Sequence, residues 1–138
     1  MKMMAVTALF AAVLQSGGLT MRSIDQGQES RIDVSKQVSA RTADEWDALW
    51  KQHAAGRARP AVDFNKEVIA AVFLGSRPSA GYSVRIVRVR QEGAALVVSY
   101  TETRPAPDAL TAQVLTSPYQ IVAIPKGSTT DVKFERVN

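Results

Sequence analysis

The sequence predicts an α+β fold, in which one mostly antiparallel sheet of about five to six strands carries a single amphipathic helix. Three observations favour this class. One segment combines helical periodicity with a helix-start signal, and several short segments show the alternation or the unbroken apolar character of strands. The connections between those strands are short, which permits antiparallel neighbours, whereas parallel neighbours need long crossovers.

Composition excludes several classes of protein and site. The 138 residues are 46% hydrophobic and 22% charged, as in an ordinary globular domain. The absence of cysteine excludes disulfides, thiolate metal sites, thiol nucleophiles and a lipid anchor on an N-terminal cysteine. The 17 basic and 13 acidic residues give a net charge of +4. Nucleic-acid binders usually cluster their basic residues, and the nearest cluster here is only Arg85, Arg88 and Arg90, so nucleic-acid binding is not expected.

Residues 1–18 have the pattern of a secretory signal peptide. Lys2 precedes a ten-residue apolar run, residues 5–14, and small and polar residues follow it. A run of this length is too short to cross a bilayer as a helix, which takes about 20 residues. We therefore expect an exported protein, periplasmic or extracellular, with no membrane span in the mature chain. The alternative is a retained N-terminal helix that packs on the domain.

The rest of the chain divides into an arm and one domain. Residues 15–29 are polar, contain three glycines and have no clear period, so residues 19–29 are interpreted as a flexible arm or linker. The domain then occupies residues 30–138. Its first predicted strand is marked by Ile32, Val34 and Val38, which alternate with polar residues, and Lys36 interrupts this face, as expected of an edge strand.

The helix has the clearest signals. Thr42 and Glu45 form a capping box, in which the Thr42 hydroxyl accepts from the Glu45 N–H and the Glu45 side chain reaches back to the Thr42 N–H. The apolar face follows at i, i+3, i+4 and i+7, namely Trp46, Leu49, Trp50 and His53. Gly56 is a suitable C′ residue. The two tryptophans can each bury about 200 Å², so the helix is expected to anchor the core against the sheet.

The predicted strands differ in how they are covered. Residues 68–74 form an unbroken apolar run, which is typical of a central strand covered on both faces. In residues 82–90 the apolar phase slips at Ile86 and Val87, which predicts a bulge or a change of packing environment. A hairpin turn is expected at residues 91–94. Further strands are expected at residues 96–100, 119–124 and 132–134.

Groups that break bonds are scarce. His53 is the only histidine, so no zinc set can form around it, and a packed or capping role is expected. No G-x-S-x-G motif is present, and no spacing singles out a pair among the carboxylates. The sequence therefore predicts a non-enzyme without metal or cofactor. A water-excluded cleft that held His53 against an acidic residue and a serine would contradict this interpretation.

Two loops are candidate sites for a protein partner. Residues 77–82 and 115–119 each contain a proline-stiffened turn that leads into a tyrosine at a strand start. Tyrosine and arginine are favoured binding anchors, and rigid loops lose little entropy on binding. The candidate partner-binding residues are Arg77, Pro78, Tyr82, Ser117, Pro118 and Tyr119. The alternative is that both tyrosines are core residues whose hydroxyls bond to loop backbone.

A family resemblance is carried by four segments of the chain. In order, they are Asp44–Trp50, Pro60–Phe64, Gly75–Tyr82 and Leu115–Tyr119. Together they resemble the PrcB C-terminal family over roughly Ser30 to Phe134, with Ala80 where the pattern usually has a second glycine. The resemblance implies an exported accessory subunit of a bacterial protease complex, whose founding member is a lipoprotein that associates with a secreted subtilisin-like protease. It implies no catalytic residues.

Two classes of function remain as hypotheses. The first is a non-catalytic, exported protein-binding module, an accessory or inhibitor-like partner of a secreted protease. The alternative is a small-ligand-binding or structural module of the bacterial cell envelope, in which the sheet face with Arg85, Arg88 and Arg90 would line a polar groove. The sequence does not fix the oligomeric state.

Overall fold

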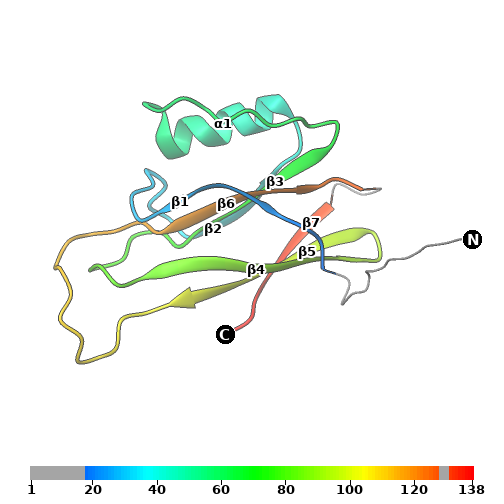
Figure 1. Ribbon diagram of the computed structural model, residues 1–138. Coiled ribbons are helices and arrows are strands. Elements are labelled where there is room, and N and C mark those ends of the chain that lie inside the picture. Colours follow the sequence, from blue (N-terminus) through cyan, green and yellow to red (C-terminus); the bar gives the residue numbers. More distant parts are fainter. Residues whose placement is uncertain (1–17, 128–130) are drawn as a thin grey trace, which may run out of the picture.

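The computed structural model describes residues 18–127 and 131–138, which form three layers (Figure 1). The first layer is a helix, α1 (Ala43–Ala54), and the other two are sheets. The strands are β1 (Arg22–Gly27), β2 (Lys36–Ala40), β3 (Glu67–Phe73), β4 (Ser83–Glu92), β5 (Ala95–Thr103), β6 (Tyr119–Pro125) and β7 (Asp131–Arg136). A four-stranded sheet, in the order β1-β6-β3-β2, lies between α1 and a three-stranded sheet, in the order β4-β5-β7.

The α+β class is confirmed in its coarse form, but the expected single sheet is wrong. The described residues are mostly β with one short helix, and the strands are divided between two sheets of four and three. All strand pairs are antiparallel except β5 and β7, which run parallel. The chain changes sheets after β3, after β5 and after β6. Short connections permit neighbouring strands to pair but do not require it.

The middle sheet is covered on both faces, as the apolar run in β3 predicted. Ile69, Ala71 and Phe73 face α1 and pack with its two tryptophans. The alternate residues Val68 and Val72 face the three-stranded sheet and belong to a second core. This division follows from the two-residue period of a strand. A sequence that is apolar at every position therefore produces two cores on opposite sides of one sheet.

The helix begins as predicted and ends differently. The Thr42 hydroxyl accepts a hydrogen bond from the Glu45 N–H at 3.1 Å. The Glu45 carboxylate, however, accepts from the N–H of Arg41 at 2.8 Å rather than from that of Thr42. The C-cap is Ala55 in a right-handed conformation, and Gly56 is not among the glycines with positive φ. The turn after α1 therefore does not use a left-handed glycine.

Several strand predictions are confirmed and two segments differ. The bulge in β4 lies between Ile86 and Arg88, and the hairpin turns at Gly93, whose φ is +60°. β2 is an edge strand, but it starts at Lys36, and the side chain of Val34 is 61% exposed.

The predicted arm, residues 19–29, contains β1, which pairs with β6. The predicted signal peptide lies outside the described residues except for Gly18. Within residues 18–127 and 131–138, no helix has the length and apolarity needed to cross a bilayer.

Candidate functional site

The two loops predicted to bind a partner lie against each other. The backbones of Arg77 and Thr116 exchange two hydrogen bonds, of 2.8 and 2.9 Å. The Ala80 N–H donates to the Ala112 carbonyl at 3.0 Å, and the Thr116 hydroxyl donates to the Ser79 carbonyl at 3.1 Å. We call residues 75–82 and 104–118 together the loop platform. Its backbone bonds join the connection before β4 to the connection before β6.

Two glycines with positive φ shape the first loop of the platform. Gly75 has a φ of +83°, and a Cβ atom there would lie 2.7 Å from the backbone nitrogen of Ser35. Gly81 has a φ of +97°, and a Cβ atom there would lie 2.8 Å from the Cβ of Pro105. Both positions combine a left-handed backbone with a close approach, which only glycine allows without strain. The loop is thereby held close to its neighbours at both ends.

Arg77 ties the platform to the three-stranded sheet. Its Nε donates to Oε2 of Glu102 at 2.9 Å, and one terminal nitrogen donates to the Leu74 carbonyl at 3.0 Å. Its guanidinium also lies over the ring of Tyr82, 5.9 Å from the ring centre. Arginine has a planar fork of donors that suits such a combination of contacts. Arg77 is half-buried. It therefore stabilises the interior of the platform and also forms part of its surface.

The partner of Arg77 is a buried carboxylate. The side chain of Glu102 has no exposed surface, and its other oxygen lies 3.3 Å from a terminal nitrogen of Arg136. Arg104 is more distant, at 3.9 Å. Burial opposes ionisation of Glu102, but the hydrogen bond from Arg77 and the surrounding arginines outweigh it, so the pKa of Glu102 lies below its usual value. The carboxylate therefore stays charged and fixes the position of Arg77.

The second loop of the platform exposes large apolar side chains. Leu110 is completely exposed, Leu115 is 79% exposed and Val114 is 54% exposed. Loops as long as residues 104–118 that lack regular structure are uncommon in compact domains and are usually functional. Apolar groups held in water by an anchored loop are also the type of feature that marks protein-interaction sites. The sequence contained these residues, but a loop has no periodicity that distinguishes exposed from buried positions.

The predicted partner-binding residues divide into surface and interior positions. Pro78 is exposed, and Arg77, Tyr82 and Ser117 are half-buried. Pro118 and Tyr119 are buried, so in this structure they do not present a surface to a partner. Tyr119 packs edge-on against His53, with 4.3 Å between ring centres. The core position that the alternative interpretation gave to both tyrosines is thus found for Tyr119, whereas Tyr82 is half-buried.

His53 lies at the centre of a buried polar array that sequence reasoning missed. Its Nδ1 is 2.7 Å from the Ser30 hydroxyl, and its Nε2 is 2.9 Å from Oδ2 of Asp25. The same carboxylate oxygen accepts a 2.7 Å hydrogen bond from Arg57. Burial lowers the pKa of His53 below its usual 6.5, against the opposing effect of Asp25. The imidazole is therefore neutral near pH 7.

A serine, a histidine and an aspartate joined in this way have the composition of a hydrolase triad, with the two ring nitrogens exchanged. The surroundings differ from those of a working nucleophile. His53 is 1% exposed and Ser30 is 8% exposed, and the Ser30 hydroxyl also accepts a hydrogen bond from the Ile32 N–H. The array is packed between α1 and the middle sheet rather than presented to solvent. Its geometry joins β1, the following loop and α1.

Possible metal ligands do not gather in the described part of the chain. Within residues 18–127 and 131–138, no group of three histidines, aspartates or glutamates is placed to hold an ion. Of the arginines predicted to line a groove, Arg88 and Arg90 lie near Glu135, and Arg85 lines a groove at the edge of β4. Arg90 binds Glu92 and Glu135, and the hydrogen bonds from Arg90 and Ser99 lower the pKa of Glu135 to about 2.

Comparison with known proteins supports the family resemblance over the centre of the chain. The family model described as PrcB C-terminal matches residues 68–125, which run from β3 to the end of β6 and include the loop platform. No curated protein and no solved structure matches the chain. The match confirms the resemblance for this segment, and it leaves α1 and the His53 array outside the matched residues.

Proposed function

We propose, from the match of residues 68–125 to the PrcB C-terminal family, that this chain is a non-catalytic, exported protein-binding module and an accessory or inhibitor-like partner of a secreted protease. The loop platform is the proposed contact surface. The observation that carries this proposal is the exposure of Leu110, Val114 and Leu115 on a loop whose backbone is bonded to its neighbour.

A binding surface that must become ordered on association binds less tightly than one that is ordered beforehand. Each side chain or loop that becomes fixed on association reduces the affinity. The backbone bonds at Ala80 and Thr116 and the ion pair between Arg77 and Glu102 already restrict the platform before a partner arrives. Burial of the exposed leucines would then contribute about 25 cal/mol for each Å² removed from water. A restrained apolar surface is suited to tight contact with a protein.

The proposed contact residues differ in part from those expected from the sequence. Arg77, Pro78 and Ser117 remain candidates at the surface of the platform, and Tyr82 contributes as the ring beneath Arg77. Pro118 and Tyr119 are assigned a supporting role because they are buried. The added contact residues are Leu110, Val114 and Leu115. A few well-buried residues at the centre of an interface usually carry most of its binding energy.

The test is co-purification from the native host. An affinity-tagged chain is recovered from the culture supernatant and cell envelope, and its partners are identified by mass spectrometry. We expect a secreted protease with the wild-type chain. The double variant Leu110→Asp, Leu115→Asp should retain about a tenth of that protease or less, because two charges would have to be desolvated at the interface.

The matched control is Val137→Asp, which places a charge on an exposed apolar residue outside the platform. This variant should recover the protease as well as the wild type does. Recovery of the wild-type chain without any protease would refute the proposed partner class. Equal loss in both variants, or no loss in either, would refute the platform as the contact surface. Circular dichroism of each variant verifies that the fold is intact.

A further inference from the structure

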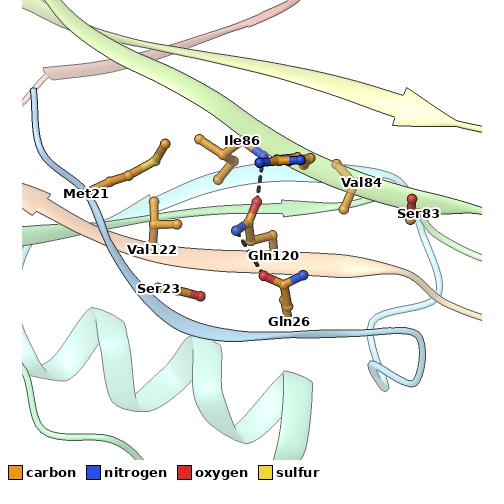
Figure 2. A pocket seen from close by; sticks show the side chains of 9 residues that line it. Met21, Ser23, Gln26, Ser83, Val84, Ile86, Gln120 and Val122 are labelled. Atoms are coloured by element: carbon orange, nitrogen blue, oxygen red, sulfur yellow. Dashed lines mark hydrogen bonds between the residues drawn. The ribbon is translucent and has the colours of Figure 1, made fainter. Parts of the chain in front are cut away.

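A groove runs between the free edges of the two sheets. β1 is the outer strand of the four-stranded sheet and β4 is the outer strand of the three-stranded sheet. Residues from both strands, from β6 and from the segment before β1 line a hollow of about 450 Å³, including Met21, Gln26, Arg85 and Val122. Figure 2 shows Gln120 in the middle of this groove, between Ile86 on one side and Gln26 on the other.

The backbone of β4 directs hydrogen-bonding groups into this groove. The N–H of Ile86 donates to the Gln120 side chain rather than to β5. Opposite Val84, the backbone N–H and C=O of Glu102 both bond to the side chain of Asn138. Glu102 is the residue opposite Val84, and because its backbone groups bond to Asn138, the two residues form a non-hydrogen-bonded pair. The Val84 N–H and C=O therefore face away from β5. Val84 itself lines the hollow.

Two other segments of the chain already form hydrogen bonds with the outer edge of β4, one near each end of the strand. The Leu19 N–H donates to the Val89 carbonyl at 2.7 Å, and Gly18 forms an antiparallel bridge with Arg90. At the other end, the Tyr82 carbonyl accepts from the Gln28 side chain at 3.2 Å. Between these contacts, within the described residues, nothing pairs with the outward N–H and C=O of Val84. An open strand edge of this kind is a template for another strand.

The side chains around the open edge determine which residues an added strand could place there. Ile86 and Val122 form an apolar floor. Arg85 points to the opposite face of β4 from Val84 and Ile86, is exposed, and forms no ion pair within residues 18–127 and 131–138. Successive residues of an added strand also alternate between two faces. An apolar residue over the floor would therefore be followed by a residue beside Arg85, where a carboxylate is complementary.

We propose that the β4 edge between Tyr82 and Ile86 binds an extended segment of a partner protein by strand addition, and that this segment carries an acidic residue flanked by apolar residues. Main-chain hydrogen bonds to Val84 supply affinity, and the floor and Arg85 supply selectivity. The residues that line the groove lie outside the loop platform, which meets the β4 edge only at Tyr82. A partner that occupied both surfaces would be held by two independent contacts.

The probe is a short acetylated and amidated peptide, Ser-Thr-Val-Glu-Val-Thr-Ser, titrated into the ¹⁵N-labelled full-length chain. We expect the backbone amide resonances of Val84, Arg85 and Ile86 to shift. The same peptide with Gln in place of Glu should bind about tenfold more weakly. A third peptide, with N-methyl groups on both valines, should not bind, because it cannot donate to the Val84 carbonyl.

Protein variants separate this proposal from the platform. Arg85→Glu should weaken binding of the Glu peptide about tenfold or more and leave the Gln peptide unchanged. Lys133→Glu, an exposed charge on the same sheet, is the control and should bind like the wild type. The Leu110→Asp, Leu115→Asp variant should also bind normally. Shifts that avoid the β4 edge, binding of the N-methylated peptide, or an unaffected Arg85→Glu variant would each overturn strand addition at this edge.

Discussion

The hydrogen bonds of His53 fix which of its nitrogens carries the proton. The Ser30 hydroxyl donates to Nδ1, and Nε2 then donates to the Asp25 carboxylate. A second proton would require the Ser30 hydroxyl to turn and accept from Nδ1. It would also add charge among the rings of Trp50, Phe73 and Tyr119. The folded protein therefore favours the neutral imidazole, as the lowered pKa of His53 indicates.

This array predicts a pH dependence of stability in mild acid. The unfolded chain binds a proton on His53 near pH 6.5, whereas the folded chain binds it only at lower pH. The free energy of unfolding should then be constant above pH 7 and decrease as the pH falls below about 6.5. Urea denaturation between pH 7.5 and pH 5 measures this slope, and carboxylates contribute little there because most titrate near pH 4.

His53→Gln is the matched variant, since it retains a polar side chain without a titrating group. It should be less stable at pH 7.5 and should lose the slope between pH 7 and pH 5. Because His53 is the only histidine, a slope that persisted in the variant would contradict this assignment.

The buried carboxylate of Glu102 gives a second prediction for single residues. Arg77→Ala removes the hydrogen-bonded partner of a carboxylate with no exposed surface, and should lower the free energy of unfolding by about 2 kcal/mol. Arg104→Ala removes a guanidinium that is 66% exposed and 3.9 Å from Glu102, and should cost less than about 0.5 kcal/mol. Equal effects in urea denaturation would show that Glu102 is not held by Arg77.

At the scale of elements, local signals located the helix and most strands. The capping hydroxyl of Thr42, the unbroken apolar run of β3 and the phase slip in β4 each depend on neighbours within a few residues, and each was predicted correctly. β1 was missed because its side chains are mainly polar and its strand character comes from pairing with β6, nearly one hundred residues later by sequence position. Ile32 and Val34 alternate like a strand, but they lie before β2 begins.

Gly75, in the first loop of the platform, is a position where alanine should lower the stability of the protein. Gly75→Ala should destabilise the protein by about 2 kcal/mol, because φ is +83° and the new methyl group would meet backbone atoms of Val34 and Ser35. Backbone atoms cannot move aside as a flexible side chain can. Thermal and urea unfolding measure the loss.

The control for this prediction is Gly56→Ala. An alanine methyl group at position 56 would have no atom within 4 Å, and Gly56 has no positive φ, so alanine should be neutral or slightly stabilising there. A Gly75→Ala variant as stable as Gly56→Ala would show that the loop can relax without cost.

At the scale of the whole molecule, the middle sheet couples two cores. One face packs on α1 and the other packs on the three-stranded sheet. The described layers should therefore unfold together. Leu96→Ala creates a cavity in the second core, far along the chain from the tryptophans of α1, and should cost about 3 kcal/mol.

Tryptophan fluorescence reports on the helix layer, since Trp46 and Trp50 both lie in α1. Far-ultraviolet circular dichroism reports mainly on the sheets. The two transitions of Leu96→Ala should shift together to the same lower denaturant concentration. A circular dichroism transition that shifted while the fluorescence transition stayed in place would mean that the layers unfold separately.

The division into two sheets is the part of the fold that the sequence did not reveal. Every strand except β1 could be recognised from its own residues, but the choice of partner depends on contacts between segments far apart, such as β1 with β6 and β5 with β7. The same reason explains the candidate site. Arg77 and Tyr82 could be singled out by residue type, whereas the contact of their loop with Thr116 and the burial of Tyr119 depend on that pairing.

The bulge in β4 has a consequence for insertions and deletions. Ile86 is opposite Tyr100 and Arg88 is opposite Ser99, so Val87 is the surplus residue and its side chain is 43% exposed. Excision of this one codon would straighten the strand while every remaining side chain kept its inner or outer orientation. What the extra valine adds is a local bend beside the groove, and a homologue that lacks it would keep the core while losing the curvature at that edge.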